Sequence, residues 1–310
     1  MSDIAFLFPG QGSQFVGMGG KLYEQYPIAR EIFERADRAL GFKISALCFE
    51  GPEETLKKTE ITQPALLTVS AAANAVLKEA GFHPAVVAGH SLGEYSALES
   101  AGAIEFEHAV LLVHKRGRYM QEAVPQGEGA MAALLRLPEG KLDAVLTQAR
   151  NGDVVTAANF NSPDQVVIAG HASAVGRAME LAKAAGAKRA IALAVSAPFH
   201  SPLMQPAQEK MKAELDRIRF NNLSVPLINN WRASEITTGD AARESLYEQI
   251  PNPVLWTDSV RALAARGVKR FVEVGAGSVL LGLCRSIDPT LKGASFGAPE
   301  DMEKVKALLS

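Results

Sequence analysis

The sequence predicts an α/β protein: a short parallel sheet covered by helices, with a small βαββαβ subdomain inserted into it. Two observations lead to this fold class. Short apolar runs bounded by glycine or proline alternate with segments of helical length, which is typical of parallel strands covered on both faces. A stretch in the middle of the chain also has the order of a ferredoxin-like unit. The 310 residues suffice for one large domain or two unequal ones.

The two outer parts of the chain supply the elements of the large domain. Apolar runs predict buried strands at residues 4–8, 84–89, 225–229 and 270–274. Helical patterns cover residues 62–80 and 107–123. The first of these helices is alanine-rich and is expected to end at Gly81, because glycine commonly terminates helices.

The middle of the chain predicts the inserted subdomain. It follows the glycine-containing segment 125–129. Strands are expected at residues 130–137, 154–159, 165–169 and 189–195, with helices at residues 139–150 and 173–185. We therefore assign residues 125–197 to a ferredoxin-like subdomain and residues 1–124 and 198–310 to the large domain.

Composition excludes several classes of protein. Apolar residues make up 47% and charged residues 21% of the chain, and the net charge is −2. These values are typical of a globular enzyme and do not predict nucleic-acid binding. Cys48 and Cys284 stand in no metal-binding motif, so we expect two buried thiols and no metal site. No run is long enough to span a bilayer and none resembles a signal peptide, so we expect a cytoplasmic protein.

The run GHSLG at residues 89–93 predicts a nucleophilic serine. It follows a predicted strand and precedes a predicted helix, which is the context of the G-x-S-x-G nucleophile elbow. The glycines let the chain turn sharply and place Ser91 at a helix N-terminus, where developing negative charge is favoured. The free amide of Leu92 could then form part of an oxyanion hole.

The run PGQGSQ at residues 9–14 follows the first predicted strand. It is no dinucleotide-binding loop, because Phe15 stands where the third glycine should be, and no Walker A loop, because Met18 replaces the lysine. Two interpretations remain open. The loop is either a plain turn or a backbone that directs an N–H group at a neighbouring site.

A serine needs a neighbouring base before it can attack a thioester. His200 is the candidate, because it lies where the chain returns from the inserted subdomain and where a cleft would form. A structural histidine in a turn is the alternative. We expect the side chain of His90 to point away from the elbow. No acidic residue is obviously placed as a third member, so a backbone carbonyl could orient the imidazole instead.

Arg116 lies on the apolar stripe of the helix predicted at residues 107–123. Its guanidinium should therefore face inward, where an unpaired charge is costly. One interpretation is a structural ion pair with a carboxylate of the protein. The other is that the partner is a carboxylate of the substrate, which a guanidinium binds with two hydrogen bonds.

The chain resembles bacterial malonyl-CoA:acyl carrier protein transacylases over nearly its full length. Eight segments carry the resemblance, in order: FPGQGSQ at residues 8–14, TQPA at 62–65, GHSLGEY at 89–95, KRGRYMQ at 115–121, residues 159–163, APFHS at 197–201, QIPNPV at 249–254 and EVGAG at 273–277. Any one of them is modest evidence, but eight in the right order are specific to this family.

The resemblance implies a hydrolase-like core and a function for each motif. The implied activity moves a malonyl group from coenzyme A to the phosphopantetheine thiol of acyl carrier protein through a serine ester, without a cofactor of the enzyme itself. The implied residues are the nucleophile Ser91, the base His200, the oxyanion-hole amides of Gln11 and Leu92, the carboxylate-binding Arg116, the His200-orienting carbonyl of Gln249, and Asn161 as support of the same region.

Phe199 precedes the histidine, and in related polyketide acyltransferases phenylalanine at this position accompanies malonyl rather than methylmalonyl. The carrier could nevertheless belong to fatty acid or to polyketide synthesis. A lipase-like thioesterase or esterase is a less favoured alternative, because Arg116 does not suit an apolar acyl site. A non-catalytic scaffold is also disfavoured, because Ser91, His200 and Arg116 are all present. Nothing requires an oligomer, and we expect a monomer that binds neither nucleic acid nor membrane.

Overall fold

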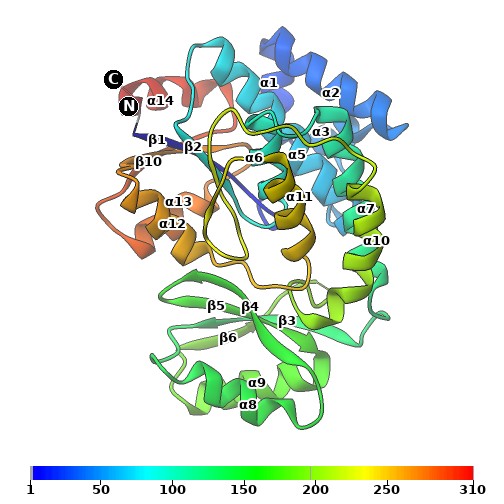
Figure 1. Cartoon of the computed structure of the whole chain (residues 1–310), viewed down its shortest axis with the longest axis vertical. Helices are drawn as coiled ribbons and strands as arrows, with labels where there is room; N and C mark the ends of the chain where they lie inside the picture. The colour runs from blue at the N-terminus through cyan, green and yellow to red at the C-terminus, as the bar shows by residue number, and fades with distance from the viewer. Residues whose placement is uncertain (1–2, 196, 310) are drawn as a thin grey trace.

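The large domain is built on a six-stranded sheet with the strand order β10-β9-β1-β2-β7-β8 (Figure 1). The computed structural model describes residues 3–195 and 197–309. Neighbouring strands are parallel except β7 and β8, so the predicted parallel sheet is confirmed, with an antiparallel strand at one edge. The strands are β1 (Ile4–Phe8), β2 (Val86–Gly89), β7 (Leu227–Ile228), β8 (Glu235–Ile236), β9 (Arg270–Val274) and β10 (Lys292–Phe296).

Helices cover both faces of this sheet. Phe6 and Phe8 of the central strand β1 belong to one hydrophobic core, and Ala5 and Leu7 belong to another, because successive side chains of a strand point to opposite faces. The helices of the domain are α1 (Gly20–Gln25), α2 (Pro27–Leu40), α3 (Ile44–Glu50), α4 (Glu53–Leu56), α5 (Thr59–Glu79), α6 (Gly93–Ser100), α7 (Phe106–Glu122), α10 (Gln205–Leu215), α11 (Gly239–Glu248), α12 (Trp256–Ala265), α13 (Val279–Ile287) and α14 (Met302–Leu309).

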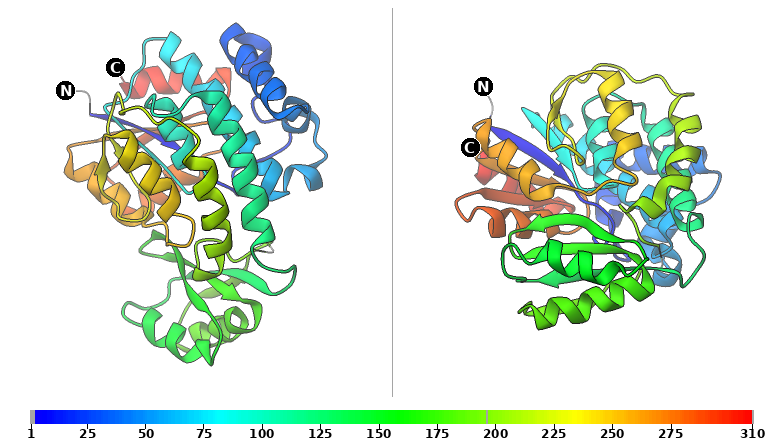
Figure 2. Two further views of the ribbon diagram at one scale, coloured as in Figure 1. Left: turned by 45° about the vertical axis from the view of Figure 1, so that its right-hand side comes forward. Right: turned by 60° about the horizontal axis from the view of Figure 1, so that its bottom comes forward.

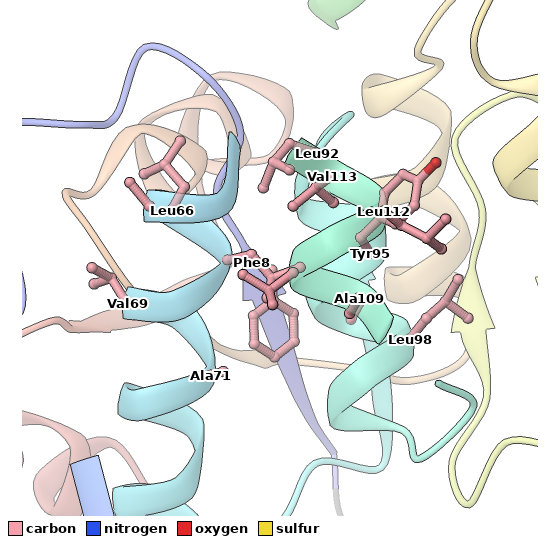
Figure 3. Packing of buried hydrophobic residues seen from close by; sticks show 14 of the residues in the cluster. Phe8, Leu66, Val69, Ala71, Leu92, Tyr95, Leu98, Ala109, Leu112 and Val113 are labelled. Carbon is pink, nitrogen blue, oxygen red and sulfur yellow. The ribbon is translucent and has the colours of Figure 1, made fainter. Parts of the chain in front are cut away.

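Helices α5 and α7 pack together over one face of the sheet. Figure 3 shows Phe8 between them. Helix α5 begins three residues earlier than the sequence predicts and contains Pro64. A proline cannot donate a hydrogen bond to the carbonyl four residues before it, and His114 Nδ1 of α7 lies 2.8 Å from that carbonyl, on Glu60. A donor from the neighbouring helix therefore replaces the one that the proline lacks.

The inserted subdomain has its own antiparallel sheet, with the strand order β4-β5-β3-β6, and its own hydrophobic core. Its elements are β3 (Gly129–Leu135), α8 (Leu142–Arg150), β4 (Val155–Ser162), β5 (Gln165–His171), α9 (Ala172–Ala184) and β6 (Arg189–Ala192). Sequence and topology are those of the ferredoxin-like unit. Strand β6 ends three residues before the predicted Val195. Leu193 N still donates to Met131 O of β3 at 2.9 Å, and Leu193 and Val195 line a cavity that residues of both domains form.

The two sheets lie one above the other in Figures 1 and 2, with the inserted subdomain at the bottom of Figure 1. Backbone hydrogen bonds join β4 of the inserted subdomain to the segment before α12 of the large domain: Phe160 N donates to Val254 O at 2.9 Å, and Val254 N donates to Ala158 O at 2.9 Å. Cys48 and Cys284 are buried free thiols, as the sequence predicts. None of the helices in residues 3–195 and 197–309 has the length and hydropathy that crossing a bilayer requires.

Candidate active site

Ser91 occupies a sharp turn between β2 and α6, and its own backbone is left-handed, with φ of 52°. Glycine is required on both sides of the serine, because backbone carbonyl oxygens occupy the space that a Cβ atom would need. A Cβ atom on Gly89 would lie 1.9 Å from the carbonyl oxygen of Gly93, and one on Gly93 would lie 2.0 Å from that of Phe8. The predicted strand–turn–helix context of Ser91 is therefore present, and the backbone strain typical of functional sites falls on the serine itself.

Asn230 holds the turn from the other side. Its Oδ1 accepts a hydrogen bond from Ser91 N at 2.6 Å, and its Nδ2 donates to Gly89 O at 2.6 Å. Asn230 is not among the site residues predicted from the sequence. Its position shortly after β7, at the edge where the carboxyl ends of the parallel strands meet, is the only signal that could have indicated it.

His200 lies directly beside Ser91. Its Nε2 is 2.7 Å from Ser91 Oγ, and its Nδ1 is 2.8 Å from the carbonyl oxygen of Gln249. Because a carbonyl oxygen only accepts, Nδ1 carries the proton and leaves Nε2 free to accept the serine proton. Among the described residues no carboxylate contacts the imidazole, so the carbonyl occupies the place that an acid has in a triad.

His90 differs from the expectation that it points away. It borders the same cavity as Ser91. Its Nε2 lies 2.8 Å from Asn161 Oδ1, and its ring packs edge-on against Trp256. Asn161 therefore contacts His90 directly and has no hydrogen bond to His200 within the described part of the chain.

Burial shifts the titration of the histidine. The side chain of His200 is 3% exposed, and burial, with a smaller contribution from the charge of Arg116, lowers the pKa of His200 to about 3. A lowered pKa keeps an imidazole neutral until the pH falls through that value. His200 is thus in the form that can act as a base at neutral pH.

We therefore expect acylation of Ser91 to be nearly independent of pH between about pH 8 and about pH 5. If His200 had an ordinary pKa, the rate would fall below about pH 6.5, because a protonated imidazole cannot act as a base. Single-turnover rates of acyl-enzyme formation across this range measure the effect directly. A tenfold loss of rate between pH 7 and pH 5, with the enzyme still folded, would contradict the assignment.

Arg116 reaches the site from α7 and is fully buried, with 1% of its surface exposed. Its guanidinium donates to Gln63 Oε1 at 2.8 Å, Gln249 Oε1 at 2.7 Å and Ser91 Oγ at 3.1 Å. Arg116 forms no ion pair with a carboxylate of the described residues, and its Nε has no hydrogen-bond partner among them. The structural ion pair is therefore absent from this part of the chain, and the cation is held only by neutral groups.

A cavity of about 110 Å³ joins these groups. Its walls include Gln11, Leu92 and Phe199, together with Ser91, His200 and Arg116. Gln11 stands in the loop after β1, and Leu92 immediately precedes α6. No described residue accepts a hydrogen bond from the backbone N–H of either one, so both amides are available to a ligand. Gln63, which also lines the cavity, was present in the recognised motifs but had no predicted role.

An α/β core that places a serine at a strand–turn–helix junction beside a histidine defines the class of serine-dependent acyl-transfer enzymes. The sequence model of the family described as acyl transferase domain matches residues 5–298 of this chain. The chain belongs to the acyl transferase family. The resemblance predicted from the sequence is confirmed.

Relatives and solved structures agree with this membership. The malonyl CoA-acyl carrier protein transacylase of Escherichia coli K12 is 51% identical over 97% of this chain and 98% of its own length, and that of Bacillus subtilis is 50% identical over 98% and 96%. An acyl carrier protein S-malonyltransferase from Vibrio cholerae has a TM-score of 0.96 at 45% identity and covers 98% of this chain and 100% of its own. A malonyl-transacylase solved with a type II polyketide acyl-carrier protein also scores 0.96, at 44% identity, over 99% of each chain.

Proposed function

We propose that this protein transfers a malonyl group from coenzyme A to the phosphopantetheine thiol of acyl carrier protein through an ester on Ser91. The observation that carries the proposal is the position of Arg116. It is a buried cation without a carboxylate partner among the described residues, and its Nη2 lies 3.1 Å from Ser91 Oγ. An acyl group with its own carboxylate supplies the missing anion, and malonyl is such a group.

His200 carries out the proton transfers of both half-reactions in the proposed mechanism. Its Nε2 takes the proton of Ser91 Oγ as the oxygen attacks the thioester carbonyl, and the amides of Gln11 and Leu92 stabilise the oxyanion. The carbon–sulfur bond breaks, and the imidazolium gives its proton to the coenzyme A thiolate. In the second half, His200 takes the proton of the carrier thiol, the thiolate attacks the ester, and Ser91 Oγ leaves and regains a proton.

Gln249 supports two of these groups at once. Its backbone carbonyl accepts from His200 Nδ1, and its side-chain oxygen accepts from Arg116. The described residues contain no group of three or more His, Cys, Asp or Glu side chains that could hold a metal ion. That the enzyme needs no cofactor stays a prediction. The serine and the base come from the same chain, so we propose that a monomer is active.

Phe199 is proposed to fill the space beside the malonyl α-carbon, since its side chain lines the cavity and is 8% exposed. Phe199→Ser should relax the preference for malonyl over methylmalonyl by about 10- to 200-fold at most, the range that one methylene decides in an apolar pocket. Competition between the two coenzyme A esters measures the ratio. An unchanged ratio would show that Phe199 only packs in the core.

A thioesterase is the second candidate, and kinetics separates the two. Transfer through an enzyme ester gives parallel lines in initial-rate plots against malonyl-CoA and carrier, because the first product leaves before the second substrate reacts. Intersecting lines would contradict the ester mechanism, and release of malonate faster than transfer to the carrier thiol would favour the thioesterase.

The carrier could belong to fatty acid or to polyketide synthesis. Rates of malonyl transfer to carriers of the two kinds, compared at equal concentration, show which of them the enzyme serves.

A further inference from the structure

Glu94 is a completely buried carboxylate behind the active site. It lies in the first turn of α6, three residues after Ser91, and is 0% exposed. One of its oxygens accepts a hydrogen bond from Ser245 Oγ. The other accepts from Asn230 N at 3.1 Å and from Gln249 Nε2 at 2.9 Å. Within the described residues Glu94 forms no ion pair, so all of its direct partners are neutral donors.

The contact with Gln249 fixes which way round the side-chain amide stands. An ionised carboxylate can only accept, so it holds the NH₂ group of Gln249 toward itself at 2.9 Å, while the carbonyl oxygen of Ser91 accepts from the same group at the longer distance of 3.4 Å. The amide oxygen must then face the opposite way, where it accepts from Arg116 Nη2 at 2.7 Å. If the amide turned over, its NH₂ group would face the guanidinium, donor against donor, and Arg116 would lose one of its three acceptors.

The contact with Asn230 extends the same support to the nucleophile. Asn230 N donates to Glu94, while Asn230 Oδ1 accepts from Ser91 N and Asn230 Nδ2 donates to Gly89 O. These residues come from β2, α6 and the loop after β7, and Glu94 contacts Asn230 and Gln249 through a single oxygen. One buried acceptor thus connects the turn that carries Ser91 with the residue that contacts Arg116 and His200.

We propose that Glu94 is a positioning residue for malonyl specificity: it orients the Gln249 amide so that the oxygen holds Arg116 ready for the acyl carboxylate. This inference rests on the proposed function. Orientation needs an acceptor toward Gln249 and Asn230, but it does not need the negative charge. A protonated Glu94 can donate to Ser245 Oγ and still accept on its other oxygen, and a glutamine can do the same with its NH₂ group and its carbonyl. Both forms of Glu94 are relevant at neutral pH, because burial raises its pKa to about 7.

The test compares three variants with the wild-type enzyme. Glu94→Ala removes the acceptor, Glu94→Gln keeps it, and Glu273→Ala is the matched control. Glu273 is also 0% exposed, but its oxygens accept from the amides of Leu280 and Leu281 and not from the site. Rates of acyl-enzyme formation from malonyl-CoA and from acetyl-CoA, the melting temperature and a crystal structure are measured for each.

In Glu94→Ala the ratio of malonyl to acetyl acylation should fall about ten- to hundredfold, by analogy with the loss caused by removing a residue that orients a metal ligand. Glu94→Gln should stay within about threefold of wild type, and Glu273→Ala should lower the melting temperature with the ratio unchanged. A general loss of stability cannot produce this pattern, because it would affect both acyl donors alike.

Three results would overturn the inference: an unchanged ratio in Glu94→Ala, an equal loss with both acyl donors, or a Glu94→Gln enzyme as impaired as Glu94→Ala. The crystal structure of Glu94→Ala decides it independently of activity, because we expect the Gln249 amide to leave Arg116. If the wild-type enzyme formed no malonyl ester at all, the proposed function would fall. The crystal structure of Glu94→Ala would still test the orienting role: a Gln249 amide that has left Arg116 supports it, and one that keeps its contact with Arg116 contradicts it.

Discussion

Replacing His200 with alanine is expected to slow both half-reactions by at least about 10²- to 10⁴-fold, the range of general base catalysis. One imidazole removes the serine proton in acylation and the carrier thiol proton in deacylation, and its Nε2 lies 2.7 Å from Ser91 Oγ. Formation of the acyl-enzyme and its discharge to carrier, each measured as a single turnover, give the two rates.

The control for this prediction is the neighbouring histidine. His90 borders the same cavity and is held by Asn161, but it has no hydrogen bond to Ser91 within the described residues. His90→Ala should therefore retain a far larger share of activity than His200→Ala. A His200→Ala enzyme within tenfold of wild type would assign the base to another group.

Replacing Arg116 with alanine should weaken malonyl transfer specifically. Losing one member of a buried charge pair costs about 2–5 kcal/mol. At about 1.4 kcal/mol per tenfold, malonyl transfer should fall by about 30- to 4,000-fold. Acetyl transfer should stay level or rise, because acetyl no longer meets an unpaired cation in a dry cavity. The comparison uses malonyl-CoA and acetyl-CoA as donors with the same enzyme preparation.

Arg116→Lys and the melting temperature complete this experiment. Lysine should recover little activity, because a point charge does not reproduce the planar fork that binds a carboxylate. The arginine also donates to Gln63 and Gln249, so Arg116→Ala leaves two buried amide oxygens without a donor, and the melting temperature measures that cost separately. A stable Arg116→Ala enzyme that still prefers malonyl would refute the carboxylate-binding role.

The parts of the site that the sequence could predict depend on local patterns. Ser91 follows from a five-residue motif in its strand–turn–helix context, and the inward direction of Arg116 follows from the 3.6-residue period of α7. His200 could be selected only as a candidate, because the sequence does not show that the chain returning from the inserted subdomain passes over the nucleophile.

The residues that sequence reasoning missed act through contacts between distant segments. Asn230 meets Ser91 across 139 positions, and Glu94, which had no predicted role, meets Gln249 across 155. No periodicity or spacing encodes such contacts. Helix α5 was predicted too short for a related reason: the replacement of the donor that Pro64 lacks comes from His114 of another helix. Tertiary structure here decides what local propensity leaves open.

The central claim is that the malonyl group passes through an ester on Ser91. Mass spectrometry of the enzyme mixed with malonyl-CoA in the absence of carrier tests it most directly. We expect one malonyl adduct per chain, located on the peptide that contains Ser91, absent from Ser91→Ala, and discharged when carrier with its phosphopantetheine thiol is added. Transfer to the carrier by an enzyme that never carries this adduct, or by the Ser91→Ala variant, would contradict the account.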